Sequence, residues 1–318
     1  MRALLYPLTA TLILITATVQ AADPAPKTAK PNKVVDYLLD ISVTIHAKNA
    51  SGSGVFVVTK DGQVWVLTCG HLVEHIRSER KSAKGTAIEF ADAEIVQVLV
   101  EDGRKTGESA LYAEVIRYSD ADHGEDIALL RLRSKKYKPA SGARFYLDDD
   151  IPAVGTKLYH CGSLHGDLGA NSVTWGIISQ HGRLLNDKVF DQTTCPAKPG
   201  SSGGAVCLEE DGRYIGMIVR GSGDTFNFTV PIRRMRTWAK RVGVDFIFDD
   251  RLEIPSDEKL KAHPIDDDPT NKPGSTKPGD DDDDDMSVRH SGIRSFWLEF
   301  DNRDRPTPIG LRPISGRR

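Results

Sequence analysis

A serine in a glycine-rich loop is the first residue of this sequence whose surroundings favour chemistry. Ser202 lies in the segment Lys198-Pro199-Gly200-Ser201-Ser202-Gly203-Gly204, directly before an apolar run. A serine hydroxyl is a poor nucleophile until a base takes its proton, and the oxyanion that then forms needs backbone N–H donors. Flanking glycines permit the tight turn that aims such donors. A flexible Gly/Ser loop is the alternative, but a linker would not lead straight into an apolar strand.

His71 has the residue type of the required base. It ends the segment Val66-Leu67-Thr68-Cys69-Gly70-His71, where an apolar strand runs into a corner of small residues. Histidine is the usual general base near neutral pH, and such a corner would present its imidazole at the strand end. The chain has nine histidines, so an ordinary exposed or hydrogen-bonded histidine is the alternative.

Asp126 has the residue type that orients such a base. It directly precedes the apolar run Ile127–Leu132. A carboxylate there can accept a hydrogen bond from an imidazole, which fixes the tautomer and stabilises the imidazolium. Asp122 and Glu125 are nearby rivals, and we prefer Asp126 because it abuts the apolar run. A surface acid before a strand is the alternative.

The elements that must position these residues are mostly short β-type runs broken by Gly, Asp and Asn. Eleven candidate strands cover residues 41–45, 54–59, 64–68, 88–100, 111–118, 127–132, 157–161, 173–179, 204–208, 214–219 and 226–230. The second and third are joined through Lys60-Asp61-Gly62 and predict a hairpin. Residues 231–242 change to helical spacing and predict one amphipathic helix. Many strands and one closing helix indicate an all-β fold, either two barrels or a sandwich.

The first 33 residues have the composition of a leader and a linker. A basic start, an apolar run and the small residue Ala21 predict a signal peptide over residues 1–21, cleaved after Ala21. A retained anchor helix is the alternative, although Pro7 and several threonines interrupt a run that barely reaches the roughly 20 residues needed to span a bilayer. Residues 22–33 are rich in Ala, Pro and Lys and predict a linker. No later segment is apolar enough to span a membrane, so we expect an exported protein, periplasmic or secreted, without a stable membrane span after cleavage.

The charge of the C-terminal part is segregated. Residues 249–285 hold fourteen acidic and five basic side chains with five prolines, which predicts a disordered acidic linker. Residues 286–318 hold seven arginines and three acids and form a basic C-terminal segment that is too short for a domain. The net charge of −3 therefore sums unlike parts. Residues 34–248 are the one predicted folded domain.

The order His71, Asp126, Ser202, together with its strand context, resembles the trypsin-like serine proteases of the chymotrypsin fold. The HtrA-like bacterial branch is the most similar one, since the chain also has Gly52-Ser53-Gly54 and the closing segment Phe226-Asn227-Phe228-Thr229-Val230-Pro231-Ile232. This resemblance covers residues 34–242 and implies two six-stranded antiparallel β-barrels with a C-terminal helix. HtrA-like proteins often carry a PDZ domain after the protease. Only 76 residues follow Val242, so none is expected.

The resemblance implies a role for each residue of the three motifs. Ser202 would attack the scissile carbonyl, His71 would carry the proton and Asp126 would orient His71. The backbone N–H groups of Gly200 and Ser202 would form the oxyanion hole. Many digestive relatives have Asp before the nucleophile, paired with a new N-terminus. This chain has Ser201 there, so activation by that ion pair is not expected, and whether the loop is ordered by default is open.

The resemblance also implies a substrate pocket and a disulfide. The pocket would be walled by Ala197, Val219, Gly221 and Phe226. Because the segment before the nucleophile holds no acid, a preference for Lys or Arg is not expected. Bulky Phe226 would shorten the pocket, so we expect it to favour small or medium aliphatic side chains. Cys161 and Cys207 stand at places that are bridged in many secreted relatives, with a spacing that differs by one residue, and four cysteines allow three full pairings. No metal or other cofactor is expected, because the usual zinc spacings are missing.

Two functions remain in competition at this point. The first is an exported serine endopeptidase that hydrolyses peptide bonds in protein or peptide substrates through an acyl-enzyme. The second is a catalytically inactive homologue that binds peptides or a protein partner. A nucleic-acid partner is not expected, because the folded part is near neutral and has no aromatic–basic motif. The run of six aspartates at 280–285 predicts a solvating spacer rather than a Ca²⁺ cage.

Overall fold

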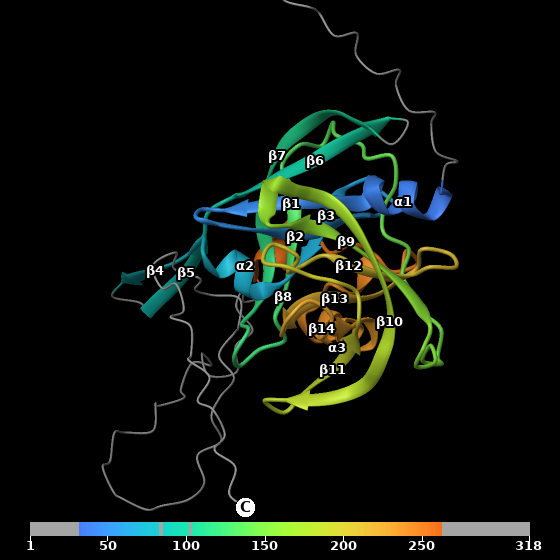
Figure 1. Ribbon diagram of the computed structural model, residues 1–318. Helices are drawn as coiled ribbons and strands as arrows, with labels where there is room; N and C mark the ends of the chain where they lie inside the picture. The colour runs from blue at the N-terminus through green and yellow to red at the C-terminus, as the bar shows by residue number, and fades with distance from the viewer. Residues whose placement is uncertain (1–31, 83–84, 102–103, 263–318) are drawn as a thin grey trace, which may run out of the picture. The chain divides into compact units, whose positions relative to one another are not determined.

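The computed structural model describes residues 32–82, 85–101 and 104–262, all within one compact unit. Two closed antiparallel barrels of six strands each dominate it (Figure 1). This arrangement confirms the two-barrel fold and excludes the sandwich. The predicted signal peptide, the linker before Asn32 and the chain beyond Ala262 lie outside the described residues.

The first barrel has the strand order β1-β2-β3-β8-β7-β6. Its strands are β1 (Ser42–Ala47), β2 (Ala50–Val58), β3 (Val64–Thr68), β6 (Ala93–Glu101), β7 (Arg104–Ser119) and β8 (Ile127–Leu132). The predicted hairpin is confirmed, because Val55 pairs with Leu67 and Val58 with Val64. All five residues of β3 are buried, so this strand is covered on both faces. Trp65 meets Phe246, from the segment after the closing helix, at a ring distance of 5.1 Å.

The second barrel has the strand order β10-β11-β14-β13-β12-β9. Its strands are β9 (Lys157–Leu164), β10 (Gly169–Leu185), β11 (Lys188–Thr193), β12 (Ala205–Leu208), β13 (Tyr214–Gly221) and β14 (Asn227–Pro231). β12 is fully buried between β9 and β13. It begins three residues after Ser202, so a strand in the barrel core anchors the glycine-rich loop.

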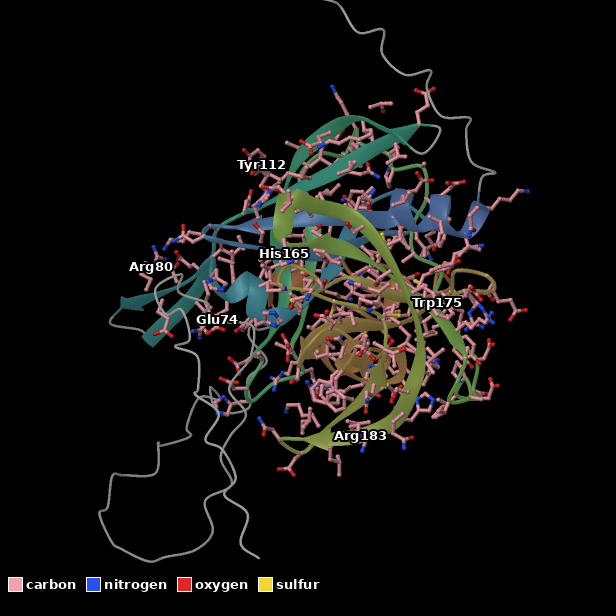
Figure 2. All side chains as sticks on the ribbon, viewed as in Figure 1. Glu74, Arg80, Tyr112, His165, Trp175 and Arg183 are labelled. Carbon is pink, nitrogen blue, oxygen red and sulfur yellow. The ribbon has the colours of Figure 1, made fainter. Side chains whose placement is uncertain are left out.

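One predicted strand is two strands in the structure. The run 88–100 is divided between β5 (Gly85–Phe90) and β6, and β5 pairs with β4 (Arg77–Ser82) in a separate two-stranded sheet. The break falls at Ala91, whose N–H donates to the Ile76 carbonyl and turns the chain toward the barrel. In Figure 1 the β4–β5 hairpin projects from the barrel beside α2, and Figure 2 labels Arg80 on this hairpin and Glu74 at the end of α2.

The helices lie at the boundaries of the barrels. They are α1 (Lys33–Ile41), α2 (Gly70–Glu74), α3 (Ile232–Val242) and α4 (Asp257–Ala262), with 3₁₀ turns η1 (Gly166–Leu168) and η2 (Asp245–Ile247). The predicted closing helix is confirmed as α3, which buries Ile232, Met235, Trp238 and Ala239. The helix α1 was not predicted, although Asn32 caps it by accepting from the N–H groups of Val34 and Val35. Within the described ranges, none of the helices has the length and apolar character needed to cross a membrane.

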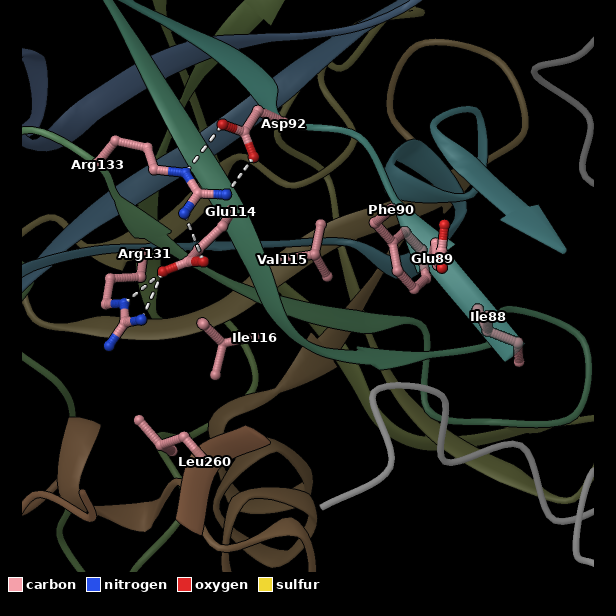
Figure 3. Close-up of a pocket in the computed structure, with 10 residues that line it drawn as sticks. All are labelled: Ile88, Glu89, Phe90, Asp92, Glu114, Val115, Ile116, Arg131, Arg133 and Leu260. Atoms are coloured by element: carbon pink, nitrogen blue, oxygen red, sulfur yellow. Dashed lines mark hydrogen bonds and ion pairs between the residues drawn. The ribbon is translucent and has the colours of Figure 1, made fainter. Parts of the chain in front are cut away.

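The predicted disordered linker is wrong over its first part, because the chain remains folded as far as Ala262. Leu260 of α4 is only 3% exposed, and its carbonyl accepts from the buried guanidinium of Arg117 at 2.9 Å. Asp257 pairs with Arg131. Leu260 and Ile116 both line a pocket of about 380 Å³, and Figure 3 shows the two side chains close to each other. Acidic composition predicted disorder, but one apolar side chain and a buried arginine dock this turn on the first barrel.

Candidate active site

His71 and Asp126 form a hydrogen-bonded pair at the edge of the first barrel. Oδ1 and Oδ2 of Asp126 lie 3.0 and 3.1 Å from Nδ1 of His71. Oδ1 also accepts the backbone N–H of His71 at 2.9 Å. Asp126 is 1% exposed, whereas the His71 side chain is 31% exposed. A carboxylate held in this way fixes the Nδ1–H tautomer of the imidazole and leaves Nε2 as the basic nitrogen.

The backbone around this pair brings α2 unusually close to the loop before β8. A Cβ added at Gly70 would lie 2.0 Å from the carbonyl oxygen of Ser119, so only glycine fits there. Asp126 itself has a φ of 57°, in the left-handed region. Its N–H donates to the Asp120 carbonyl at 3.2 Å. The small-residue corner expected from the sequence is therefore a close contact between the start of α2 and the loop before β8. It puts His71 in the first turn of α2.

Each member of the pair stabilises the charged form of the other. Burial lowers the pKa of His71, but the charge of Asp126, the contact with Cys69 and the hydrogen bonds outweigh it and raise the pKa well above its usual value. Burial raises the pKa of Asp126, and the charge and hydrogen bonds of His71 reverse this into a net lowering. The pair therefore favours an aspartate beside an imidazolium, which is the form a general base reaches after taking a proton.

The loop that carries Ser202 lies against β2 and β3. The carbonyl of Ser202 accepts the N–H of Ser53 at 2.7 Å, and the carbonyl of Ser53 accepts the hydroxyl of Thr68. A Cβ added at Gly203 would lie 2.0 Å from the Ser53 carbonyl oxygen. Gly203 also has a φ of 87°, in the left-handed region that favours glycine. The structure thus brings Ser202 next to the strand end that leads to His71.

Ser201 closes the turn before Ser202. Its side chain is 1% exposed, and its Oγ accepts the N–H of Lys198 at 3.1 Å. Its N–H donates to the Lys198 carbonyl at 2.8 Å. In this structure local hydrogen bonds close the loop at Ser201.

Two backbone N–H groups of this loop are available to a ligand. Ser201, Gly203 and Gly204 each donate to a carbonyl. Among the described residues, the N–H groups of Gly200 and Ser202 donate to none. Ser53 fixes the position of Gly200. The Oγ of Ser53 donates to the Gly200 carbonyl at 2.6 Å and accepts the N–H of Ser163 at 2.7 Å.

The basic nitrogen of His71 faces a cysteine. Nε2 lies 3.5 Å from the Sγ of Cys69, which is fully buried. In the part of the chain that the structure describes, no hydrogen bond joins the Ser202 hydroxyl to His71. Cys69, His71 and Asp126 also offer one donor atom each within 4.8 Å of one another, a grouping of the kind that holds metal ions.

The predicted pocket residues come from the segment before the glycine-rich loop and from β13 and the turn that follows it. Ala197 and Val219 are buried, and Phe226 is 44% exposed and packs edge-on against Phe228. Gly221 pairs with Asn227 at the start of β14. Asn227 is fully buried and donates from Nδ2 to the carbonyl of Cys195 at 2.8 Å, which ties the segment before the nucleophile to the barrel.

The predicted disulfide is wrong, because Cys161 and Cys207 are both free thiols. They lie on the paired strands β9 and β12, where Ala205 pairs with Cys161 and Cys207 pairs with Tyr159. The two cysteines are therefore diagonal neighbours, roughly 7–8 Å apart between Cα atoms, with side chains too far apart to bridge. Burial raises the pKa of Cys161 to about 12 and that of Cys207 well above its usual value, so both stay protonated.

Three functional positions were missed by the sequence reasoning or given no role there. Ser53 supports Gly200, Ser201 closes the turn and Cys69 contacts the base. Ser53 lies in the Gly-Ser-Gly segment and the other two lie beside motif residues, so their positions were visible. Their partners were not, because each partner comes from another strand or depends on how a side chain is rotated.

Two antiparallel barrels, a buried aspartate–histidine pair and a serine loop between them define the class of chymotrypsin-like proteases. Residues 52–217 match the family of the trypsin-like peptidase domain, which is more than half of the chain. The chain belongs to this family. His71, Asp126 and Ser202 all lie within the matched range.

Individual proteins show the same similarity. A protein of Arabidopsis thaliana, whose name describes it as a Do-like protease, is 31% identical over 194 residues. These residues are 57% of this chain and 38% of the plant protein, so the chain spans well under half of that relative. Among solved structures, an HtrA-type protease with a tripeptide is 21% identical, with a TM-score of 0.47 over 68% of this chain and 63% of that one. The serine endoprotease of Yersinia pestis is 19% identical, with a TM-score of 0.48 over 70% and 69%.

Proposed function

We propose that this protein is an exported serine endopeptidase that cleaves protein or peptide substrates. Ser202 forms the acyl-enzyme, His71 moves the proton from Ser202 to the leaving amine, and Asp126 orients His71. The Asp126–His71 pair carries the proposal, because a fully buried carboxylate on Nδ1 makes Nε2 the basic nitrogen of the ring.

The glycine-rich loop supports the same role. The N–H groups of Gly200 and Ser202, which have no acceptor within the described part of the chain, would supply the donors that an oxyanion needs. Peptide hydrolysis develops negative charge on the scissile carbonyl oxygen, and prepositioned donors stabilise it without reorganisation. The family and the similarity to proteases agree with this chemistry.

Labelling with a fluorophosphonate tests the nucleophile. The wild-type protein should be labelled at Ser202 and should cleave peptides, and Ser202→Ala should do neither. Ser78→Ala is the matched control, because it removes a serine hydroxyl on the exposed hairpin strand β4 and keeps the nucleophile and its loop. Labelling of Ser202→Ala at the wild-type level would contradict the proposal.

An inactive homologue that binds peptides is the second candidate. The contact that favours it is the 3.5 Å approach of Nε2 to Cys69, since the base does not hydrogen-bond Ser202 in the described structure. Peptide binding by a wild-type protein that neither cleaves nor becomes labelled would establish this alternative.

Export is part of the proposal, and cleavage after Ala21 is its checkable step. The exported protein should begin at Ala22 by N-terminal sequencing. A protein that keeps Met1 and remains with the membrane would show that the apolar run is an anchor.

Peptide-library profiling tests the expected side-chain preference. We propose that the segment around Ala197 and the exposed Phe226 select small or medium aliphatic side chains at the residue before the cleaved bond. Cleavage after Lys or Arg would contradict this preference.

A further inference from the structure

We propose that Cys69 and His71 together form a binding site for Zn²⁺ or a similar thiophilic divalent cation, which switches off the catalytic base. The site uses Sγ of Cys69 and Nε2 of His71 as its two protein ligands. Binding itself does not depend on the proposed peptidase activity, whereas the inhibitory effect does rest on it.

The distance between the two donor atoms fits such an ion. Zinc binds sulfur at about 2.3 Å and imidazole nitrogen at about 2.0–2.1 Å in tetrahedral geometry. Two ligands at these lengths and a tetrahedral angle stand about 3.6 Å apart. The Sγ of Cys69 and the Nε2 of His71 are 3.5 Å apart, so little rearrangement of either side chain is needed.

The surroundings of His71 are those of a metal-binding histidine. Such histidines usually donate their other ring N–H to a carboxylate, which fixes the tautomer and makes the ligand nitrogen more basic. Asp126 provides this contact at Nδ1, 3.0 Å away. Asp126 therefore serves as an outer partner, because it lies on the opposite side of the ring from Nε2.

The ligands also have the right chemical type and access. A thiolate and an imidazole together bind zinc in preference to calcium or magnesium, which prefer oxygen ligands. Sγ of Cys69 is fully buried, but the His71 side chain is 31% exposed, so the ion enters from the solvent side of the ring. On binding, the Cys69 thiol releases its proton to water and the sulfur–metal bond replaces the S–H bond. Water completes the remaining positions.

The consequence for catalysis follows from which nitrogen is used. Nε2 is the atom that would accept the Ser202 proton, and a coordinated nitrogen has no lone pair left for it. The ion should therefore lower kcat, and removal by a chelator should restore it.

Cobalt absorption tests binding without any need for activity. Co²⁺ added to the purified full-length protein should produce the near-ultraviolet absorption of a thiolate–cobalt bond. The band should persist in Ser202→Ala and in Cys195→Ala, which removes a buried thiol on the second barrel. It should disappear in Cys69→Ala and in Cys69→Ser, the second of which keeps the side-chain size. Asp126→Asn should weaken Co²⁺ affinity by roughly 10–100-fold.

Inhibition of peptide cleavage by Zn²⁺ tests the functional half. Zn²⁺ should inhibit the wild type and Cys195→Ala reversibly, and Cys69→Ala should need at least ten times more Zn²⁺. A cobalt–thiolate band that survives in Cys69→Ala, or never forms in the wild type, would overturn the site. Equal inhibition of wild type and Cys69→Ala would overturn the proposed effect. If the wild type has no peptidase activity, the peptidase proposal fails while the cobalt experiment still decides the site.

Discussion

The chemistry of the site depends on which side chain meets each nitrogen of one imidazole. Asp126 meets Nδ1 and Cys69 meets Nε2. The first contact is what a general base requires. The second comes from a position two residues earlier in the chain, and it gives this base a neighbour that can both shift its protonation and share a metal ion with it.

At the residue scale, the pH profile of cleavage should report this neighbour. Burial lowers the pKa of His71. The charge of Asp126 and, as a smaller effect, the contact with Cys69 outweigh burial and raise this pKa well above 6.5. Because only neutral His71 can take the Ser202 proton, activity should increase with pH and reach half its maximum above pH 6.5. Cys69→Ala removes one raising contact, so its midpoint should lie at lower pH when kcat/KM is measured against pH. Cys195→Ala is the control and should keep the wild-type midpoint. A Cys69→Ala midpoint equal to that of the wild type would contradict this prediction.

Two strand-to-loop contacts operate at the scale of single elements. Ser53 on β2 connects the glycine-rich loop to β9, and His160 on β9 connects that strand to β12. Both side chains are fully buried, so each has a consequence for stability as well as for the site.

Ser53→Ala should reduce both stability and turnover. The substitution leaves the buried N–H of Ser163 and the Gly200 carbonyl without their partner, and an unpaired buried group costs about 1–3 kcal/mol. Chemical denaturation should show that loss, and kcat should fall more than KM rises because Gly200 is freed. Ser78→Ala on the exposed hairpin strand β4 is the control and should change neither.

His160 should make the protein less stable in acid. Burial lowers its pKa to about 4, while its Nδ1 donates to the Ala205 carbonyl. The unfolded chain therefore takes up this proton near pH 6.5 and the folded chain only near pH 4. The contribution to stability is complete above pH 6.5 and is lost as pH falls toward 4, by about 3 kcal/mol. Urea unfolding at several pH values should show this slope in the wild type, and His160→Gln should lack it.

At the scale of the whole molecule, the turn α4 extends the folded unit beyond the last barrel element. It joins the chain after α3 to the first barrel through Leu260, Arg117 and Asp257. The closing helix packs against the second barrel and η2 against the first, so the C-terminal part of the folded unit contacts both barrels.

Leu260→Ala should therefore destabilise the protein by about 2–5 kcal/mol, the usual cost of truncating a buried leucine. Leu252→Ala is the matched control, since Leu252 is 38% exposed and should cost far less. Free energies of unfolding in urea provide the measurement. Equal stability of the two variants would show that Leu260 is not docked on the first barrel and that the segment is disordered, as its composition predicted.

The amino-acid sequence alone predicted the features that depend on neighbours along the chain. The motif residues His71, Asp126 and Ser202, most strands and the helix α3 follow from local patterns, because alternation, helical spacing and glycine turns act within a few residues. It missed α1, because a linker composition hid the cap at Asn32. It also predicted one strand over 88–100 where the structure has β5 and β6, since no local signal marks the turn at Ala91.

Which groups touch across strands became clear only from the three-dimensional fold. Strand register makes Cys161 and Cys207 diagonal neighbours. The sequence showed only that their spacing differs by one residue from that of the relatives, which does not give the register. Docking on the first barrel ordered α4, although the longer segment 249–285 around it is acidic overall. The fold also placed Cys69 on Nε2 of His71, a contact set by side-chain rotation at a crowded corner rather than by any sequence pattern.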